Sequence, residues 1–187
     1  ALPILINAST YGSDVSPIHE DAARGVNRGT MIRLSLLSAP LYPDPHTDQG
    51  EHSFAWSVVA DAGMDTVLAE ASRLNAPVID RLPAFAPLAR VDATEGSIVL
   101  DWVKLADDGS GDLIVRLYEP TGGMARGSLH LDGAFAGATV EEVGVTEGAD
   151  ALPEDLPRAL AVDGPQPAEG AALSLNPFQL ATLRIRR

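Results

Sequence analysis

The densest group of side chains that could do chemistry lies in one polar loop, residues 40–52. The loop contributes carboxylates and imidazoles, groups that bind metals, move protons or form charged contacts: Asp44, His46, Asp48, Glu51 and His52. Prolines at 40, 43 and 45 fix φ and remove backbone donors, so the loop forms neither a helix nor a central strand. It is longer than an ordinary connection of about 2–6 residues. A long, stiff, polar loop indicates a site or a contact surface.

A metal site is the first chemistry to weigh. Zinc accepts carboxylate and imidazole ligands, and the loop offers Asp44, His46, Asp48 and His52. Their spacing does not match the helical pair of histidines with a glutamate between them. It does not match a calcium loop either, because prolines stand where ligands are needed. We therefore expect an ordered loop with solvated carboxylates rather than a metal held by these residues alone.

Other catalytic patterns are weaker still. The chain has 26 acidic residues, so pairs of carboxylates are guaranteed by number and indicate no particular glycosidase pair. No Gly-x-Ser-x-Gly elbow occurs, and without cysteine there is no thiol nucleophile. Aromatic residues could line a sugar platform, but each lies in an alternating strand pattern that favours a place in the core or on a sheet face: Trp56, Trp102 and Tyr118.

Composition narrows the class of protein. The 187 residues carry a net charge of −13 with scattered basic residues, which argues against nucleic acid and anionic membranes as partners. No apolar run approaches the roughly 20 residues of a membrane span. The absence of cysteine fits a cytoplasmic protein. The chain begins without Met or a basic leader and directly on a strand-like run, so we expect no signal peptide and a fragment of a longer protein.

Period-two alternation predicts a mainly all-β chain. In the first part, residues 2–7 predict a strand and 12–30 a loop. Residues 31–37 predict a strand that places Ile32, Leu34 and Leu36 on one face, and we expect it to pair with a strand at 53–59. Helical spacing of apolar residues predicts one helix from Met64 to Leu74.

The second part predicts a small β-sandwich over 97–187. Residues 83–96 are rich in proline and alanine and predict a linker. Short alternating strands separated by glycine and proline turns follow, which is typical of a sandwich. The first has Ile98, Leu100 and Trp102 on one face. Later strands are expected near 113–118, 129–131, 140–145 and 181–185.

Several segments, taken together and in order, carry a family resemblance. Residues 6–14 resemble a Leu-Asn-Asp-x-x-Tyr-Gly-x-Asp segment, and 34–40 resemble Leu-Ser-Leu-Leu-Arg-x-Pro. The loop fits a Pro-Asp-x-x-x-Asp-x-Gly-x-His-x-Phe signature through Pro43, Asp44, Asp48, Gly50, His52 and Phe54. Further matches are Leu74 to Pro77, Lys104, Val115 to Glu119, Pro177-Phe178 and Thr182 to Arg184. On these residues the chain resembles the C-terminal region of glycoside hydrolase family 38 α-mannosidases, in particular the cytosolic and bacterial branch.

Two positions depart from that pattern: Ala8 stands where the family has Asp, and Ser38 where it has Arg. Residues 120–176 contribute little. The resemblance implies that residues 1–82 are the C-terminal part of a large β-sandwich with one helix and that 97–187 are the small terminal β-sandwich.

The resemblance also implies a parent enzyme. Family members are retaining exo-mannosidases whose zinc, nucleophile and general acid lie in an N-terminal barrel and the helical region after it. No catalytic or metal residue is therefore expected in this chain, which should be inactive alone, while zinc belongs to the parent's catalytic domain.

The expected partners are the catalytic barrel of the same polypeptide and a mannoside or oligosaccharide. The loop residues Asp44, His46, Asp48, Glu51 and His52 would dock on the barrel or line the substrate entrance, and we favour docking because prolines suit rigid contact. The rival interpretation is a stand-alone carbohydrate-binding or scaffold β-sandwich module.

Overall fold

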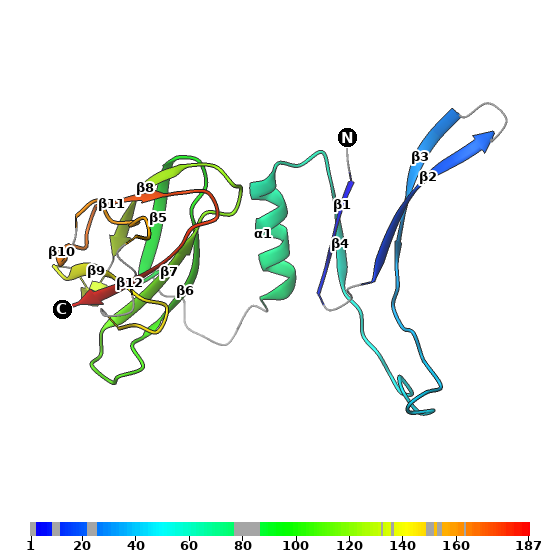
Figure 1. Cartoon of the computed structure of the whole chain (residues 1–187), viewed down its shortest axis with the longest axis horizontal. Helices are drawn as coiled ribbons and strands as arrows, with labels where there is room; N and C mark the ends of the chain where they lie inside the picture. Colours follow the sequence, from blue (N-terminus) through cyan, green and yellow to red (C-terminus); the bar gives the residue numbers. More distant parts are fainter. Residues whose placement is uncertain are drawn as a thin grey trace. The chain divides into compact units, whose positions relative to one another are not determined.

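The computed structural model describes residues 3–8, 12–21, 26–76, 87–131, 133–135, 137–148, 152, 155–162 and 164–187 (Figure 1). Mostly antiparallel strands form two compact units, Ala1–Leu82 and Pro83–Arg187, called unit 1 and unit 2 below. In the described part of the chain, no helix is long and apolar enough to cross a membrane.

Unit 1 consists of two ribbons and one helix. Strands β1 (Pro3–Asn7) and β4 (Trp56–Ala60) form one antiparallel ribbon, and β2 (Ser13–Asp21) and β3 (Val26–Leu34) form the other. Helix α1 (Met64–Asn75) contacts β1 and β4 and confirms the predicted helix (Figure 1). Asp65 in its first turn and Arg73 in its last turn complement the helix dipole.

Each face of the β1–β4 ribbon has a different neighbour. The register pairs Ile6 with Ser57 on one face, and the Ser57 hydroxyl donates to Glu70 of α1 at 2.7 Å, so this face meets the helix. Leu5 pairs with Val58 on the opposite face, which turns toward β3 and lines a groove with it. Among the described hydrophobic residues of unit 1, only Ile6 is buried, so the unit has almost no core of its own.

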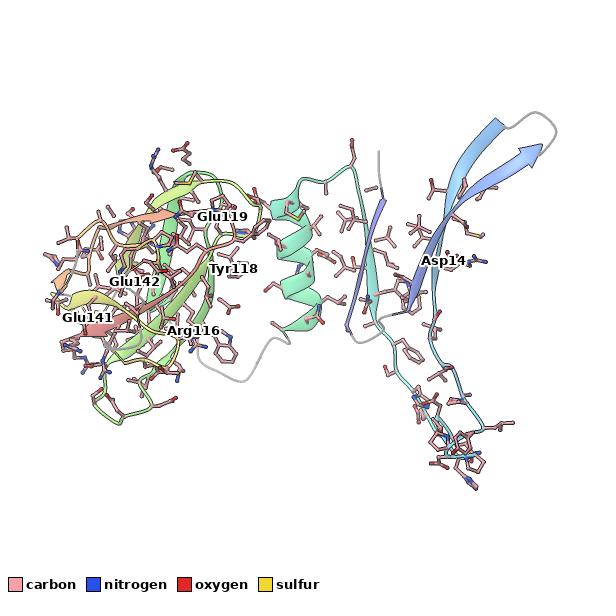
Figure 2. The ribbon with its side chains drawn as sticks, in the orientation of Figure 1. Asp14, Arg116, Tyr118, Glu119, Glu141 and Glu142 are labelled. Atoms are coloured by element: carbon pink, nitrogen blue, oxygen red, sulfur yellow. The ribbon has the colours of Figure 1, made fainter. Side chains whose placement is uncertain are left out.

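The hairpin β2–β3 corrects two predictions. Residues 12–30 were expected to be a loop, and 31–37 were expected to pair with 53–59; instead β3 pairs with β2, and β4 with β1. Pro17 and Gly29 argued against strands here, but Pro17 is tolerated in a strand with a free edge. Because both faces of this ribbon are largely exposed, as at Val15, it needs no regular apolar alternation. Asp14, which is labelled in Figure 2, forms an ion pair with Arg33 across the ribbon.

Unit 2 is a β-sandwich. One antiparallel sheet has the order β10–β9–β12–β7–β6 and the other β11–β8–β5. The first comprises β6 (Val99–Leu105), β7 (Leu113–Tyr118), β9 (Thr139–Val143), β10 (Gln166–Pro167) and β12 (Leu180–Arg186). The second comprises β5 (Ala89–Glu95), β8 (Ala125–Leu131) and β11 (Ala171–Leu175). A short 3₁₀ helix, η1 (Gly133–Phe135), precedes β9.

The core lies between these two sheets. Strands β7 and β12 contribute buried side chains to it, with Leu117, Leu183 and Ile185 fully inaccessible. Side chains of β8 and β11 meet them from the second sheet, including Leu129 and Leu175. The predicted fold class, a mainly β chain that contains a β-sandwich, is therefore confirmed.

Two details of unit 2 differ from expectation. Residues 89–95 of the predicted linker form strand β5, because Ala89 and Val91 face the core; residues 83–86 lie outside the described residues. On β6, the register shifts between Leu100 and Trp102, so Val103 packs on the core while Trp102 is 59% exposed. A bulge of this kind adds one residue and reverses the faces that follow it.

Candidate functional site

Hydrogen bonds within the polar loop hold its shape. The Asp48 carboxylate accepts from the backbone N–H of Ala39 at 2.9 Å, which ties the beginning of the loop to its far side. His52 donates from Nε2 to the Asp48 carbonyl oxygen at 3.0 Å, since a carbonyl can only accept. The His52 ring also stacks on Phe54, with the centroids 6.1 Å apart. Asp48 is thus bonded through both its side chain and its main chain.

Asp44 organises the turn at the middle of the loop. Its Oδ1 accepts from the backbone N–H of His46 at 2.8 Å, an Asx turn. Its carbonyl oxygen accepts from the Thr47 hydroxyl at 2.8 Å and from the Thr47 N–H at 3.2 Å. The two aspartates therefore hold different parts of the loop backbone and do not converge on a shared point.

These contacts bear on the metal hypothesis. Among the residues that the structure describes, no group of three or more His, Cys, Asp or Glu side chains is placed to hold a metal ion. His46, Glu51 and His52 are exposed. These donor sets do not fit zinc.

The loop also presents an apolar surface that the acidic and imidazole residues did not reveal. Leu41 is 80% exposed and Tyr42 is 87% exposed, next to the cis Tyr42–Pro43 peptide bond. Leu41 and Tyr42 follow Ala39 closely in the chain, and the hydrogen bond from the Ala39 N–H to Asp48 holds the backbone there. Neighbouring exposed apolar side chains on a loop with a fixed backbone are typical of a contact surface.

Unit 1 also has a groove lined by apolar side chains. It encloses about 290 Å³ and is lined by Leu5, Ile32, Leu34, Leu36, Trp56 and Val58. The predicted shared face of Ile32, Leu34 and Leu36 is thus confirmed, although it meets the 56–58 face across a groove rather than by strand pairing. Trp56 is 53% exposed and lies on the face of β4 that lines this groove, so of the two expected positions it has the sheet face and not the core.

In unit 2, the least expected polar group is Glu119, at the end of β7 (Figure 2). It is 1% exposed, and its carboxylate accepts from the N–H groups of Thr121 at 2.8 Å, Gly122 at 2.7 Å and Phe178 at 3.1 Å, and from the Thr121 hydroxyl. Burial alone raises the pKa of Glu119, but these donors outweigh it and lower the pKa to about 2.

Gly122 makes the close approach in this network possible. It has a φ of +79°, and a Cβ there would lie 2.7 Å from the Phe178 ring. Sequence reasoning noted Glu119 only within the Val115–Glu119 segment. The available signal was a Glu directly before a Pro-Thr-Gly-Gly turn, whose free N–H groups need an acceptor.

Unit 2 is thus a β-sandwich with its own core, and unit 1 joins a stiff loop to a scaffold with little core. Residues 97–183 match the family model described as "Glycosyl hydrolases family 38 C-terminal beta sandwich domain". The chain is 32% identical over 140 residues to Homo sapiens alpha-mannosidase 2C1, covering 68% of this chain and 12% of that protein. It is 27% identical over 143 residues to a Saccharomyces cerevisiae alpha-mannosidase, covering 65% and 13%.

The Mus musculus alpha-mannosidase 2C1 gives a similar match, 30% over 136 residues. Residues 97–183 therefore form a C-terminal β-sandwich domain of glycosyl hydrolase family 38, and the chain is similar to alpha-mannosidases. It matches only 12% or 13% of the length of these relatives.

Proposed function

We propose that the chain is the non-catalytic C-terminal β region of a retaining α-mannosidase that hydrolyses terminal α-mannosyl linkages. The observation that carries this proposal is the 32% identity over 140 residues to a protein named for that activity, together with the sandwich match. The catalytic barrel of the same polypeptide would act on the mannoside or oligosaccharide and would hold the zinc. The resemblance to the cytosolic branch supports a cytoplasmic parent.

Within that parent, the polar loop docks unit 1 on the catalytic part. Its internal hydrogen bonds support this role, because a loop held by Asp48 and Asp44 loses little conformational freedom on contact. Leu41 and Tyr42 would then be covered, and Glu51 and His46 would lie at the polar rim. The residues 1–82 would be completed into a large sandwich by other parts of the polypeptide, which agrees with the missing core of unit 1.

A double substitution in the parent enzyme, Asp48→Ala with His52→Ala, tests the docking role. It removes the bonds from Asp48 to Ala39 and from His52 to Asp48, so the loop loses its fixed shape. Docking predicts a lower Tm with an unchanged KM for a chromogenic α-mannoside. A role at the substrate entrance predicts a raised KM at an unchanged Tm. Unchanged Tm and kinetics, equal to those of an exposed control such as Asp101→Ala, would eliminate both roles.

A further inference from the structure

A second candidate site lies within unit 2. Strands β5 and β8 pair Arg90 with His130 and Asp92 with Ser128, which places these four side chains on the face turned away from the core. At one end of this face, a cavity of about 290 Å³ is lined by Pro87, Arg90, His130, Leu131 and Glu169. The cavity combines apolar and charged groups in one small concave space, as small-molecule sites do.

His130 is held in a fixed orientation in this cavity. Its Nδ1 lies 2.8 Å from Oε1 of Glu169, and its Nε2 lies 3.0 Å from the Ser128 hydroxyl. An ionised carboxylate only accepts, so Nδ1 carries a proton toward Glu169, while Nε2 contacts the Ser128 hydroxyl and lies 3.4 Å from Oδ2 of Asp92. The other Glu169 oxygen accepts from the Leu131 N–H at 2.8 Å. These contacts fix both the imidazole ring and the carboxylate before any ligand arrives.

The charges of the site exclude some ligands. Arg90 is the positive group, and it pairs with Asp92, while Glu169 adds a second negative charge. Together with a chain net charge of −13, this disfavours an anion such as phosphate. Across the described residues, no His, Asp and Glu group is placed to hold a metal. A neutral ligand that both donates and accepts hydrogen bonds fits what remains.

The Ser128–His130–Glu169 contacts resemble the order of a hydrolytic triad, but the cavity argues against that chemistry. Ser128 does not line the cavity, so its hydroxyl faces His130 rather than a bound molecule. We assign Ser128 to positioning the imidazole.

We propose that this cavity binds one pyranose ring of a neutral saccharide. Arg90 would donate to ring hydroxyls, and Glu169 would accept from them through the lone pairs that His130 and Leu131 leave free. Pro87 and Leu131 offer apolar surface to the C–H face of the ring. The site deepens the proposed function, since it adds a sugar contact outside the catalytic part, but it requires no catalysis by this chain.

The test is a titration of the ¹⁵N-labelled 187-residue chain with methyl α-D-mannopyranoside, followed by amide chemical shifts. A small ring predicts a dissociation constant of about 1–10 mM. The shifts should change at Arg90, His130, Leu131 and Glu169. Glu169→Gln and Arg90→Met should each weaken binding by about tenfold, since each removes a charge-assisted hydrogen bond.

Matched controls are Glu95→Gln and Arg126→Met. These residues form an exposed ion pair at 2.6 Å between the same two strands, outside the cavity. They should leave binding unchanged, and a native-like amide spectrum checks the fold of every variant. The proposal is overturned by any one of four results. These are no shift changes, changes confined to other residues, wild-type affinity in both cavity variants, and tighter binding of inorganic phosphate than of the sugar.

Failure of this binding site can be distinguished from failure of the proposed function. Sugar binding here with a parent enzyme inactive on α-mannosides would remove the enzyme proposal and leave this site in place. An active parent whose isolated chain shows no such binding would do the reverse.

Discussion

The Glu119 carboxylate accepts a hydrogen bond from the backbone N–H of Phe178 at 3.1 Å, across 59 positions of sequence. The two residues belong to separate segments of the family resemblance, Val115–Glu119 and Pro177-Phe178. Glu119 also holds the turn at Thr121 and Gly122, so one buried carboxylate joins the end of β7 to the turn before β12. This contact gives both segments a structural role, because Glu119 is the acceptor for the N–H groups of both turns.

The Glu119 network predicts a stability that depends on pH. The folded state lowers the pKa of Glu119 from 4.5 to about 2, so its contribution is present above the unfolded pKa and is lost as the pH falls toward 2. Glu119→Gln should lower the Tm at neutral pH and flatten the decline of Tm between about pH 5 and pH 2. Thermal unfolding of the chain at a series of pH values measures both. A slope equal to that of wild type would refute this assignment, and Glu95→Gln is the exposed control.

Substitution of Leu183 measures how much the sandwich core contributes to the free energy of unfolding of unit 2. It is fully buried and lies in β12, next to β7 and β9 in the sheet. Leu183→Ala should reduce the free energy of unfolding of unit 2 by about 2–5 kcal/mol, because it removes buried methyl groups and leaves a cavity. Urea unfolding followed by circular dichroism measures the change. The exposed control Leu156→Ala should stay within about 0.5 kcal/mol of wild type, and a similar effect of both would contradict the packing described.

The exposed apolar surface of unit 1 predicts self-association of the isolated chain. The groove residues and the free ribbon edges lack covering groups within the described residues, as Trp56 and Val58 illustrate. Such surfaces and edges promote association. Sedimentation velocity should show oligomers that grow with concentration for residues 1–187, whereas residues 83–187, which have their own core, should remain monomeric. A monomeric full chain would argue against an incomplete sandwich in unit 1.

The tip of the loop predicts a contact in the parent enzyme. Replacing Leu41 and Tyr42 by Ser removes two exposed apolar side chains without touching the Asp48 and Asp44 hydrogen bonds. If these side chains are covered by the catalytic part, the Tm of the parent should fall by several degrees, while the isolated chain should become less prone to associate. Val162→Ser, an exposed apolar change in unit 2, is the matched control. Equal Tm values for wild type and the loop variant would rule out this contact.

The sequence predicted most strongly the elements with a regular period and a buried face. Leu113, Val115 and Leu117 alternate and are buried, and the apolar spacing of residues 64–74 became α1. Prediction from the sequence failed where burial does not determine the order of apolar and polar residues. The described side chains of β2 are mostly exposed, so Pro17 and Gly29 outweighed a weak strand signal. At Trp102 the failure has another cause, since a bulge changes the face without changing the residue types.

The candidate sites show the same limit. Spacing identified the polar loop but could not show that Asp44 and Asp48 bond to separate backbone groups, because that depends on the fold of the loop itself. The cavity at His130 joins β5, β8 and the turn at Glu169. His130 and Glu169 are 39 positions apart in the sequence, and only the pairing of the strands brings them together.

The most direct measurement of the central claim is an assay of 4-nitrophenyl α-D-mannopyranoside hydrolysis by the parent polypeptide and the 187-residue chain, side by side at equal molar concentration. We predict turnover by the parent and a rate at background for the chain, because the proposed function assigns the catalytic and zinc-binding residues to the barrel of the parent. Hydrolysis by the purified chain, or a parent with no activity on any α-mannoside, would contradict it.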